Sequence, residues 1–470
     1  MSESQKNVTR RGFIKAGAVA SAAVATGLVN VPFVHAAGSD TIKVGVIGCG
    51  GRGTGAAQNI LEAAPNVQIV ALADVFERKV KDAKKRLEAY PISQPDDDDQ
   101  KKRIKARIKE LGNSAVKISD DNLYHGLDSI QRLVQNKEVN YVILATPPGF
   151  RPVCIQECVS AKKNFFTEKP VAADGAGIRK VLDAYDDAKK LGLHIAAGTQ
   201  RRHQFWYMET LKRVHDGAIG DIVNMHCHWN NSHDIWFRPR AEVKDFLNVE
   251  DTDLAYQLHN WYHFLWTCGD HINEQHVHNL DVCNWAMNGH PVRATGFGGR
   301  FYRKGDKPQE SGNIWDNFSV IYDYEGKDKR NVQMFSTCSM IEGTPSDVSE
   351  AFTGTKGFCQ ANKYLINGES VTNLRKLSND EAAQANVDPY VQEHTDLIAS
   401  IRDDKPLNEL QNVAFSTLTA ILGRMAAYTG KTVTWEQALN TKEDTFPTKL
   451  SWDMKLDVPP VPVPGKTPLI

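Results

Sequence analysis

The 470-residue chain lacks several patterns that would assign it to a function class at once. None of its eight cysteines stands in a Cys-x-x-Cys pair, which excludes zinc-ribbon and thioredoxin-like motifs. Its 56 Lys and Arg against 57 Asp and Glu leave a formal net charge of −1. We therefore expect neither nucleic acid nor an anionic membrane as the main partner, because both require a basic surface.

Internal repeats are also absent, and the composition shows no bias toward disorder. The chain is too long for a small disulfide-stapled scaffold and long enough for two domains with full-sized cores. We expect most cysteines to be buried thiols. One or two disulfide bridges are the alternative that the sequence allows.

The first forty residues have the layout of an export signal. Residues 9–15 read TRRGFIK, a twin-arginine pattern, and a run of small apolar residues follows from 16 to 29. Residues 34–37 then read VHAA, and the small residue at the cut predicts cleavage after Ala36 or Ala37. The alternative, a transmembrane anchor, is disfavoured because the run falls short of the ~20 apolar residues that span a bilayer. The sequence therefore predicts a twin-arginine signal peptide over residues 1–37, export to the periplasm or elsewhere by this route, and no membrane association after cleavage.

A dinucleotide-binding pattern follows this leader. An apolar segment, 42–47, runs into GCGGRG at 48–53, which matches G-x-G-x-x-G. Apolar residues then recur at helical spacing over 56–64, and a second apolar segment, 67–73, ends on Asp74. A glycine motif alone is weak evidence, but strand, turn, helix, strand and acid in this order indicate a Rossmann domain.

Each position of the turn has a physical role in this prediction. Gly48 permits a tight turn, Gly50 lets the backbone approach a pyrophosphate, and Gly53 lets the helix pack against the strand. Gly51 and Arg52 open the helix, whose N-terminus faces the phosphates.

Asp74 predicts which dinucleotide binds. Its carboxylate can accept hydrogen bonds from ribose hydroxyls and would repel a 2′-phosphate, so we expect NAD rather than NADP. Arg78 lies nearby and moderates this preference. Because the twin-arginine route carries folded cargo and NAD is cytoplasmic, we expect NAD to be loaded before export, held tightly and returned to its starting state in each cycle.

Two further strands end near the expected cofactor. Residues 141–146 are apolar and stop at Pro147-Pro148-Gly149, so Thr146 and Pro147 should line the site at the carboxyl end of the sheet. Between the second strand and this one, the segment 91–112 is intensely charged and contains four consecutive Asp residues. We interpret it as a solvated insertion rather than an acidic metal site, because consecutive carboxylates point in different directions.

These motifs resemble the Gfo/Idh/MocA family. The resemblance rests on GCGGRG at 48–53, ATPP at 145–148 and EKP at 168–170, and extends to GTQRR at 198–202 and HNLD at 278–281. It implies an α/β fold with a Rossmann NAD-binding domain over 40–170 and a second α/β domain over 171–440. The second domain carries a large open, mostly antiparallel sheet, and a proline-rich tail occupies 441–470. It also implies a homo-oligomer, a dimer or tetramer.

The resemblance also implies catalytic residues. Glu168 and Lys169 contact the cofactor, Lys169 also contacts the substrate, and Glu274 and His278 supply an acid and the catalytic histidine. The chain departs from the family pattern, since glutamate stands in place of aspartate and His276 in place of glycine. From the residues themselves, Glu274 and His278 at i, i+4 would share one helix face. A histidine suits removal of a hydroxyl proton, although His278 also fits a structural role.

Histidine and tryptophan are concentrated between residues 226 and 278. This stretch holds eight of the 15 histidines and four tryptophans. A metal site is one interpretation, but no spacing such as H-E-x-x-H is present, and we expect no metal. We prefer a polar, aromatic pocket for a carbohydrate, in which tryptophan faces pack on sugar rings. The residues predicted to contact substrate are Arg201, Arg202, Trp236, His271 and Asp281.

The C-terminal half alternates like a sheet and then becomes helical. Residues 292–300, 317–324 and 331–338 are predicted strands, and 393–403 and 412–429 are amphipathic helices. The family resemblance implies that these helices pack on the first domain. The tail over 458–470 is expected to be extended and to clasp a neighbouring subunit.

Three functions remain open from the sequence. The leading one is an exported NAD-dependent oxidoreductase that acts on a carbohydrate hydroxyl. The second is an NAD-dependent glycosidase that cleaves by transient oxidation and elimination. The third is a non-catalytic sugar-binding protein.

Overall fold

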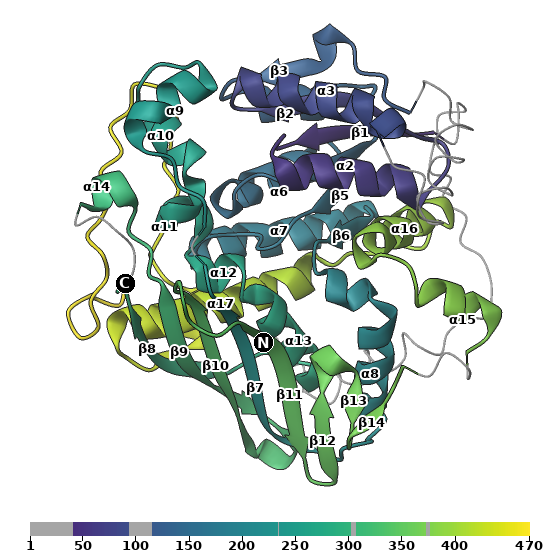
Figure 1. Ribbon diagram of the computed structural model, residues 1–470, viewed down its shortest axis with the longest axis vertical. Coiled ribbons are helices and arrows are strands. Elements are labelled where there is room, and N and C mark those ends of the chain that lie inside the picture. Colours follow the sequence, from purple (N-terminus) through teal and green to yellow (C-terminus); the bar gives the residue numbers. More distant parts are fainter. Residues whose placement is uncertain (1–40, 94–114, 234, 302–306, 373–376) are drawn as a thin grey trace, which may run out of the picture. The chain divides into compact units, whose positions relative to one another are not determined.

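The computed structural model describes residues 41–93, 115–233, 235–301, 307–372 and 377–470 (Figure 1). The predicted signal peptide and residues 94–112 of the predicted charged insertion lie outside the described residues. All described residues belong to one structural unit, Thr41–Ile470.

Short apolar segments of the first half form a six-stranded parallel sheet within the described ranges, as predicted. The last strand of this sheet, Ile195–Ala197, comes after residue 170, and the GTQRR segment at 198–202 follows it directly. The strands, in spatial order, are β3 (Leu123–His125), β2 (Val67–Asp74), β1 (Ile42–Ile47), β4 (Tyr141–Leu144), β5 (Asn164–Thr167) and β6 (Ile195–Ala197).

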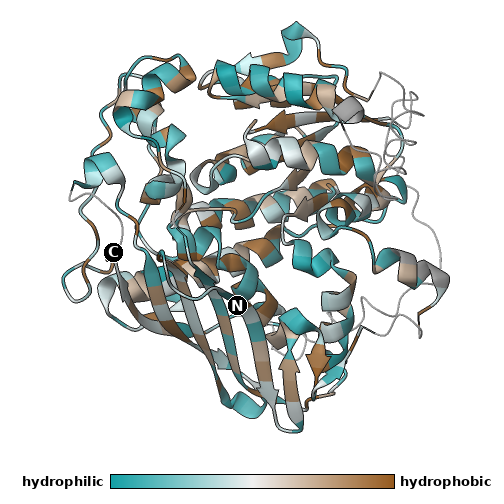
Figure 2. Ribbon diagram, in the orientation of Figure 1, coloured by the Kyte–Doolittle hydropathy of each residue, from teal (hydrophilic) through white to brown (hydrophobic). Residues whose placement is uncertain are grey.

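Helices cover both faces of this sheet. Along β4, Tyr141 and Ile143 belong to one hydrophobic cluster, and Val142 and Leu144 belong to another, because successive strand residues point to opposite faces. Figure 2 shows a largely hydrophilic α3 outside hydrophobic strands. The first cluster packs under α2 (Gly51–Ala63), α3 (Glu77–Ser93) and α16 (Pro389–Arg402), and the second under α5 (Ser129–Gln135), α6 (Arg151–Ser160) and α7 (Gly175–Leu191).

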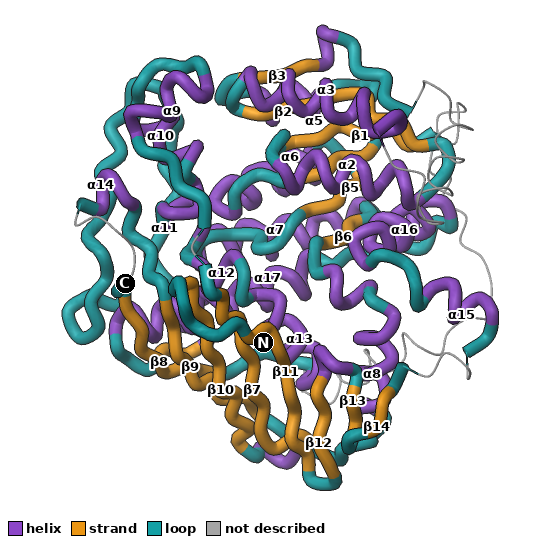
Figure 3. Tube along the Cα trace, in the orientation of Figure 1, coloured by secondary structure: helices purple, strands orange, loops and turns teal. Residues whose placement is uncertain are grey.

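The second sheet is nine-stranded in the part of the chain that the structure describes, and only β7 and β10 pair in parallel. The three strands predicted from alternation are confirmed as β8, β9 and β10, and Figure 3 shows them within this sheet. The spatial order is β14 (Glu369–Ser370), β13 (Leu365–Ile366), β12 (Gly357–Gln360), β11 (Asp347–Gly354), β7 (Ile222–Asn231), β10 (Asn331–Met340), β9 (Asn317–Glu325), β8 (Arg293–Gly299) and β15 (Val433–Thr434).

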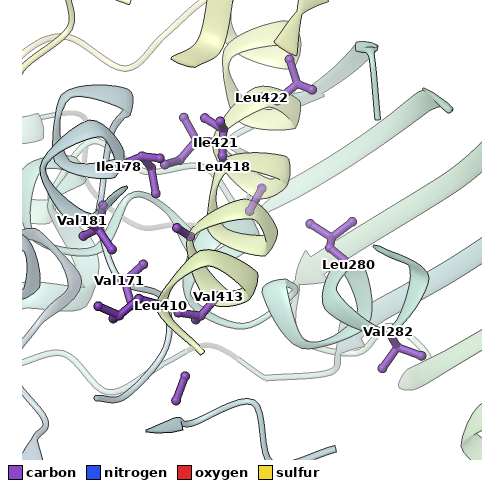
Figure 4. Packing of buried hydrophobic residues seen from close by; sticks show 14 of the residues in the cluster. Val171, Ile178, Val181, Leu280, Val282, Leu410, Val413, Leu418, Ile421 and Leu422 are labelled. Atoms are coloured by element: carbon purple, nitrogen blue, oxygen red, sulfur yellow. The ribbon is translucent and has the colours of Figure 1, made fainter. Parts of the chain in front are cut away.

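Helix α17 (Leu410–Thr429) joins the two domains through a shared core. Figure 4 shows Ile178 and Val181 of α7 on one side of α17 and Leu280 of α13 (Val277–Met287) on the other. From Ser416 to Thr429 every residue of α17 is buried, which is expected for a helix surrounded by apolar neighbours. This core connects elements of both domains.

The C-terminal tail packs along its own chain. The indole of Trp315 donates to the carbonyl oxygen of Pro462 at 3.1 Å, and the amide of Gly465 donates to that of Thr429 at 2.9 Å.

The eight cysteines are all buried and free, so the disulfide alternative does not occur. The remaining α-helices are α8 (Phe205–His215), α9 (Arg240–Leu247), α10 (Asp253–His259), α11 (Leu265–Cys268), α12 (His271–Glu274), α14 (Pro308–Ser311), α15 (Asn379–Gln384) and α18 (Trp435–Leu439).

Candidate active site

Glycines shape the turn between β1 and α2. Gly48 has a φ of 94°, and a Cβ at this position would lie 2.5 Å from the carbonyl oxygen of Ala145. A Cβ on Gly53 would lie 1.8 Å from the carbonyl oxygen of Gly48, so only glycine allows α2 to approach β1 this closely. A Cβ on Gly50 or Gly51 would meet nothing within 4 Å, which leaves open space at the N-terminus of α2.

Asp74 fixes the other side of this turn. Its Oδ2 accepts from the amide of Cys49 at 2.9 Å, and its Oδ1 accepts from the amide of Phe76 at 3.0 Å. The side chain remains partly exposed at the wall of a cavity. Each carboxylate oxygen has a second lone pair, so Asp74 can still accept from a hydroxyl.

This cavity has a volume of about 900 Å³ and is lined by both domains. Five residues predicted to contact the substrate or to act in catalysis line it: Lys169, Glu274, His278, Arg201 and Trp236. All residues predicted to bind the cofactor line it as well, namely Gly48, Gly50, Gly51, Arg52, Gly53, Asp74, Thr146, Pro147, Glu168 and Lys169.

Lys169, just after β5, is held by Glu274. Its Nζ donates to the backbone carbonyl of Glu274 at 2.6 Å and lies 3.3 Å from Oε1 of the same residue. Burial raises the pKa of Glu274 above its ordinary value, although Lys169 and Arg151 oppose this shift. An ammonium group has three donors, and Glu274 takes two, so a third is left for a ligand in the cavity.

His278 lies in the first turn of α13 and stacks on Trp229, with ring centroids 5.8 Å apart. Its Nδ1 is buried and has no hydrogen-bond partner among the described residues. Burial, assisted by the positive charges of Lys169 and Arg201, holds the pKa of His278 well below its ordinary value. The ring is therefore neutral at neutral pH and can accept a proton.

Glu274 and His278 do not share one helix, contrary to the sequence-based expectation. Glu274 ends α12 and Val277 begins α13. The amide of His276 donates back five residues, to His271, and the His276 ring bonds Ser336 of β10 at 2.6 Å. The helix is thus interrupted between the two side chains, and both still line the cavity.

Arg52 connects the glycine turn to two buried carboxylates. Its Nε donates to Glu168, and its Nη2 donates to Glu393 of α16 at 3.1 Å. The guanidinium also lies 4.6 Å from the centroid of the Tyr390 ring. Burial, followed by the adjacent Glu168, raises the pKa of Glu393 well above its ordinary value. Arg52 therefore orients the glutamate that precedes Lys169.

Arg201 reaches the cavity while bound to a buried acid. It donates to Glu350 of β11, which also accepts from Asn279 at 2.6 Å and from Tyr207 at 3.1 Å. Burial raises the pKa of Glu350 above its ordinary value, and Arg201 opposes this shift. These contacts hold the Arg201 guanidinium at the cavity wall.

Three of the residues predicted to contact substrate do not line the cavity. Arg202 forms a bidentate ion pair with Asp281, at 2.9 Å from Nη2 to Oδ1, and Asp281 also accepts from Ser416 of α17. His271 is fully buried and bonds Asp270 through Nδ1 at 2.9 Å. In the structure these side chains connect buried elements instead of facing the cavity.

No sequence motif pointed to Glu393, Tyr390 or Gln275, all at or next to the cavity. Gln275 and Tyr390 line it, and Glu393 holds Arg52. One signal was available for Glu393: it precedes Leu397 by four residues, and so places an acid on the apolar face of α16. A buried acid on such a face indicates a partner in the fold.

The residues present fit a dinucleotide. Open space beside Gly50 and Gly51 at the start of α2 suits a pyrophosphate, and Asp74 suits ribose hydroxyls. In the described ranges, no group of three or more His, Cys, Asp or Glu side chains is arranged to hold a metal ion. The fold and cavity thus define a two-domain nucleotide-binding protein with a Rossmann domain.

Two sequence models of one family match most of this chain. The "Oxidoreductase family, NAD-binding Rossmann fold" model matches residues 42–196, and the "GFO/IDH/MocA C-terminal domain" model matches residues 207–360. The chain belongs to the Gfo/Idh/MocA oxidoreductase family, and its first domain is an NAD-binding Rossmann fold.

Similar proteins include inositol dehydrogenases. Inositol 2-dehydrogenase of Rubrobacter xylanophilus is 26% identical over 52% of this chain and 57% of its own length. The chain thus spans little more than half the length of this curated relative. A Porphyromonas gingivalis protein described as a glycosyl hydrolase family 109 protein is 24% identical over 42% of this chain and 36% of its own length.

Solved structures share the fold. Scyllo-inositol dehydrogenase from Lactobacillus casei, with bound NAD(H) and scyllo-inositol, matches with a TM-score of 0.55 at 18% identity and covers 84% of this chain and 99% of its own. GenD2 from gentamicin A biosynthesis, in complex with NAD, matches with a TM-score of 0.57 at 16% identity and covers 87% of this chain and 99% of its own.

A third model, "Ubiquitinol-cytochrome C reductase Fe-S subunit TAT signal", matches residues 1–36. This match agrees with the predicted twin-arginine signal and indicates export. Among the described residues, no helix has both the length and the apolar character needed to cross a membrane.

Proposed function

We propose that this protein is an exported NAD-dependent oxidoreductase that acts on a hydroxyl group of a cyclic polyol or sugar. One observation carries the proposal: Lys169, Glu274 and His278 line the same cavity as the glycine turn and Asp74. A proton acceptor and a hydrogen-bond donor thus face the space that a nicotinamide cofactor and its substrate would share.

The three side chains suit the oxidation of a carbinol. When bound, NAD supplies the acceptor for the hydride of the carbinol carbon. The neutral ring of His278 takes the hydroxyl proton, since its low pKa leaves it unprotonated. The ammonium group of Lys169, held by Glu274, donates to the substrate oxygen as the carbonyl forms.

The remaining lining suits a carbohydrate. Trp229, Trp236 and Trp261 present aromatic surface to the cavity, and Arg201 and Gln275 add hydrogen-bond donors. Aromatic faces pack on the C–H faces of sugar rings, and the polar groups bind hydroxyls. Inositol dehydrogenases among the relatives support a cyclic polyol as the substrate class.

In this proposal, export requires the bound cofactor to be recycled within the protein. The signal delivers the folded protein to the periplasm with NAD already bound, and the cofactor is reduced and then oxidised again without leaving. The test is native mass spectrometry of the exported protein, followed by incubation with pairs of polyols and sugars. Bound NAD and paired oxidation and reduction products are expected. An exported protein that binds no NAD, or that forms no oxidised product from any polyol or sugar, contradicts the proposal.

A second candidate is glycoside cleavage through transient oxidation and elimination, because one relative is described as a glycosyl hydrolase family 109 protein. A chromogenic glycoside distinguishes glycoside cleavage from oxidation of a carbohydrate hydroxyl. Release of the chromophore without net reduction of NAD favours cleavage, whereas an intact glycoside beside an oxidised polyol favours the first proposal.

We also infer a homo-oligomer, a dimer or tetramer. Apolar side chains are exposed on the outer face of the second sheet, among them Phe297 of β8, Ile321 of β9 and Phe335 of β10. Exposed apolar patches of this kind mark interaction surfaces. Light scattering of the purified protein tests the assembly, and a monomer at micromolar concentration contradicts it.

A further inference from the structure

A third hydrophobic cluster joins the Rossmann domain to two distant parts of the chain. It contains Phe76, at the start of α3, together with apolar residues of α9 and α10 and of a C-terminal segment. We call residues 240–259 and 450–458 the cofactor cover. In Figure 1 the yellow C-terminal segment runs beside α9 and α10 at the upper left. The cover side chains in the cluster are Val243, Phe246, Leu247, Val249, Leu254, Ala255, Tyr256, Leu258, Leu450, Trp452, Met454, Leu456 and Val458.

Specific contacts attach the cover to the Rossmann domain. Arg78 of α3 donates to the backbone carbonyl of Phe246, and its guanidinium lies 4.6 Å from the Phe246 ring centroid. The rings of Phe76 and Trp452 have centroids 6.2 Å apart. The two parts of the cover are also joined, since Gln257 donates to the carbonyl of Leu456 at 2.9 Å.

The attachment point lies at the ribose-binding end of the cleft. Phe76 and Arg78 come two and four residues after Asp74, and all three line the cavity. On the cover side the same cavity is lined by Phe246, Leu247, Leu258, His259 and Leu450. The cover thus forms a wall of the cofactor cleft opposite the end of β2.

One cover residue has an unused polar group at this wall. Nδ1 of His259 is buried and has no hydrogen-bond partner among the described residues. Burial, followed by Lys79 and Arg238, lowers the pKa of His259 to about 4, so the ring is neutral at neutral pH. Its ring packs between Trp236 and Phe246, at 5.3 Å and 5.2 Å between centroids. A buried, unbonded ring nitrogen at a cavity wall indicates a group for a ligand.

We propose that the cofactor cover binds the adenosine half of NAD and retains it, so that the cofactor leaves only when the cover separates from Phe76 and Arg78. This inference rests on the proposed function, because a cofactor recycled after export must dissociate slowly. Release then requires local unpacking of the third cluster, and such openings set the dissociation rate more than the association rate.

Trp452→Ala tests the cover without changing Lys169, Glu274 or His278. The full-length protein is loaded with isotope-labelled NAD and chased with excess unlabelled NAD, and native mass spectrometry follows the exchange. We expect dissociation to be about tenfold faster in the variant, which corresponds to about 1.4 kcal/mol. Trp206→Ala is the matched control, because Trp206 is also partly buried but lies outside the cavity lining and the cover. Equal dissociation rates in Trp452→Ala and wild type overturn the proposal.

A second measurement needs no variant. Hydrogen–deuterium exchange of residues 240–259 should slow when NAD is added to the wild-type protein, because the bound cofactor holds the cover closed. Unchanged exchange in this segment overturns the proposal even if Trp452→Ala fails to fold. Both readouts use NAD alone, so failure of the cover and failure of carbohydrate oxidation are separate results.

Discussion

The ammonium group of Lys169 lies 2.6 Å from the backbone carbonyl of Glu274 and 3.3 Å from its carboxylate. The chain thus brings together, across 105 residues, a buried cation and a buried acid at one wall of the cavity. The carbonyl contact positions Lys169, and the carboxylate balances its charge.

Replacing this carboxylate should impair turnover more than cofactor binding. In Glu274→Gln the backbone contact remains, but the buried ammonium loses its counter-charge and its orientation. We expect kcat to fall by about 100-fold, the low end of what positioned acid–base groups contribute. Steady-state kinetics and NAD titration measure the two effects. A variant with unchanged kcat would show that the carboxylate plays no part in catalysis.

Two substitutions in the glycine turn should separate an effect on folding from an effect on NAD binding. Gly53→Ala places a Cβ 1.8 Å from a backbone oxygen, so the variant should lose several kcal/mol of stability or fail to fold. Gly50→Ala meets no protein atom within 4 Å and should keep wild-type stability while NAD affinity falls by about tenfold. Thermal unfolding and NAD titration check both variants. Wild-type NAD affinity in Gly50→Ala contradicts the phosphate site.

Asp74 should determine the preference for NAD. Asp74→Ser removes the negative charge that repels a 2′-phosphate, and Arg78 and Lys79 line the same cavity. We expect the ratio of NADP to NAD affinity to rise by about tenfold or more. Isothermal titration with both dinucleotides measures this ratio. An unchanged ratio means that Asp74 does not contact the ribose.

Stability should depend on pH through the buried His394. Burial, with Arg52 and His203 nearby, holds its pKa in the folded state well below the ordinary 6.5. The unfolded chain therefore takes the proton first as pH falls, and the free energy of unfolding decreases below pH 6.5. His394→Asn removes this contribution, so wild type should lose about 1.4 kcal/mol per pH unit relative to the variant. Urea unfolding at several pH values measures the difference, and parallel pH profiles contradict it.

Much of the fold was predictable because its signals are local. The glycine turn, the alternation of β8 to β10 and the cavity position of Thr146 and Pro147 follow from short segments and from the carboxyl-end rule of parallel sheets. The family followed from motifs at fixed intervals.

Long-range partners were not predictable in the same way. Arg202 and Asp281 are 79 residues apart, and their ion pair removes both from the cavity. His276 bonds Ser336 across 60 residues, between the two helices that replace the single helix expected through Glu274 and His278. The cofactor cover requires residues near 76, 246 and 452 to meet, and no local pattern encodes that meeting.

Single-turnover reduction of bound NAD tests the central claim most directly. NAD-loaded protein is mixed with a panel of cyclic polyols and sugars, and the absorbance band of reduced nicotinamide is followed. We expect at least one substrate to reduce the NAD bound to the wild-type protein. The same reaction should be about 100-fold or more slower in Lys169→Met, which retains NAD. Equal rates in both proteins, or no reduction by any substrate while NAD is bound, would contradict an oxidoreductase built on Lys169, Glu274 and His278.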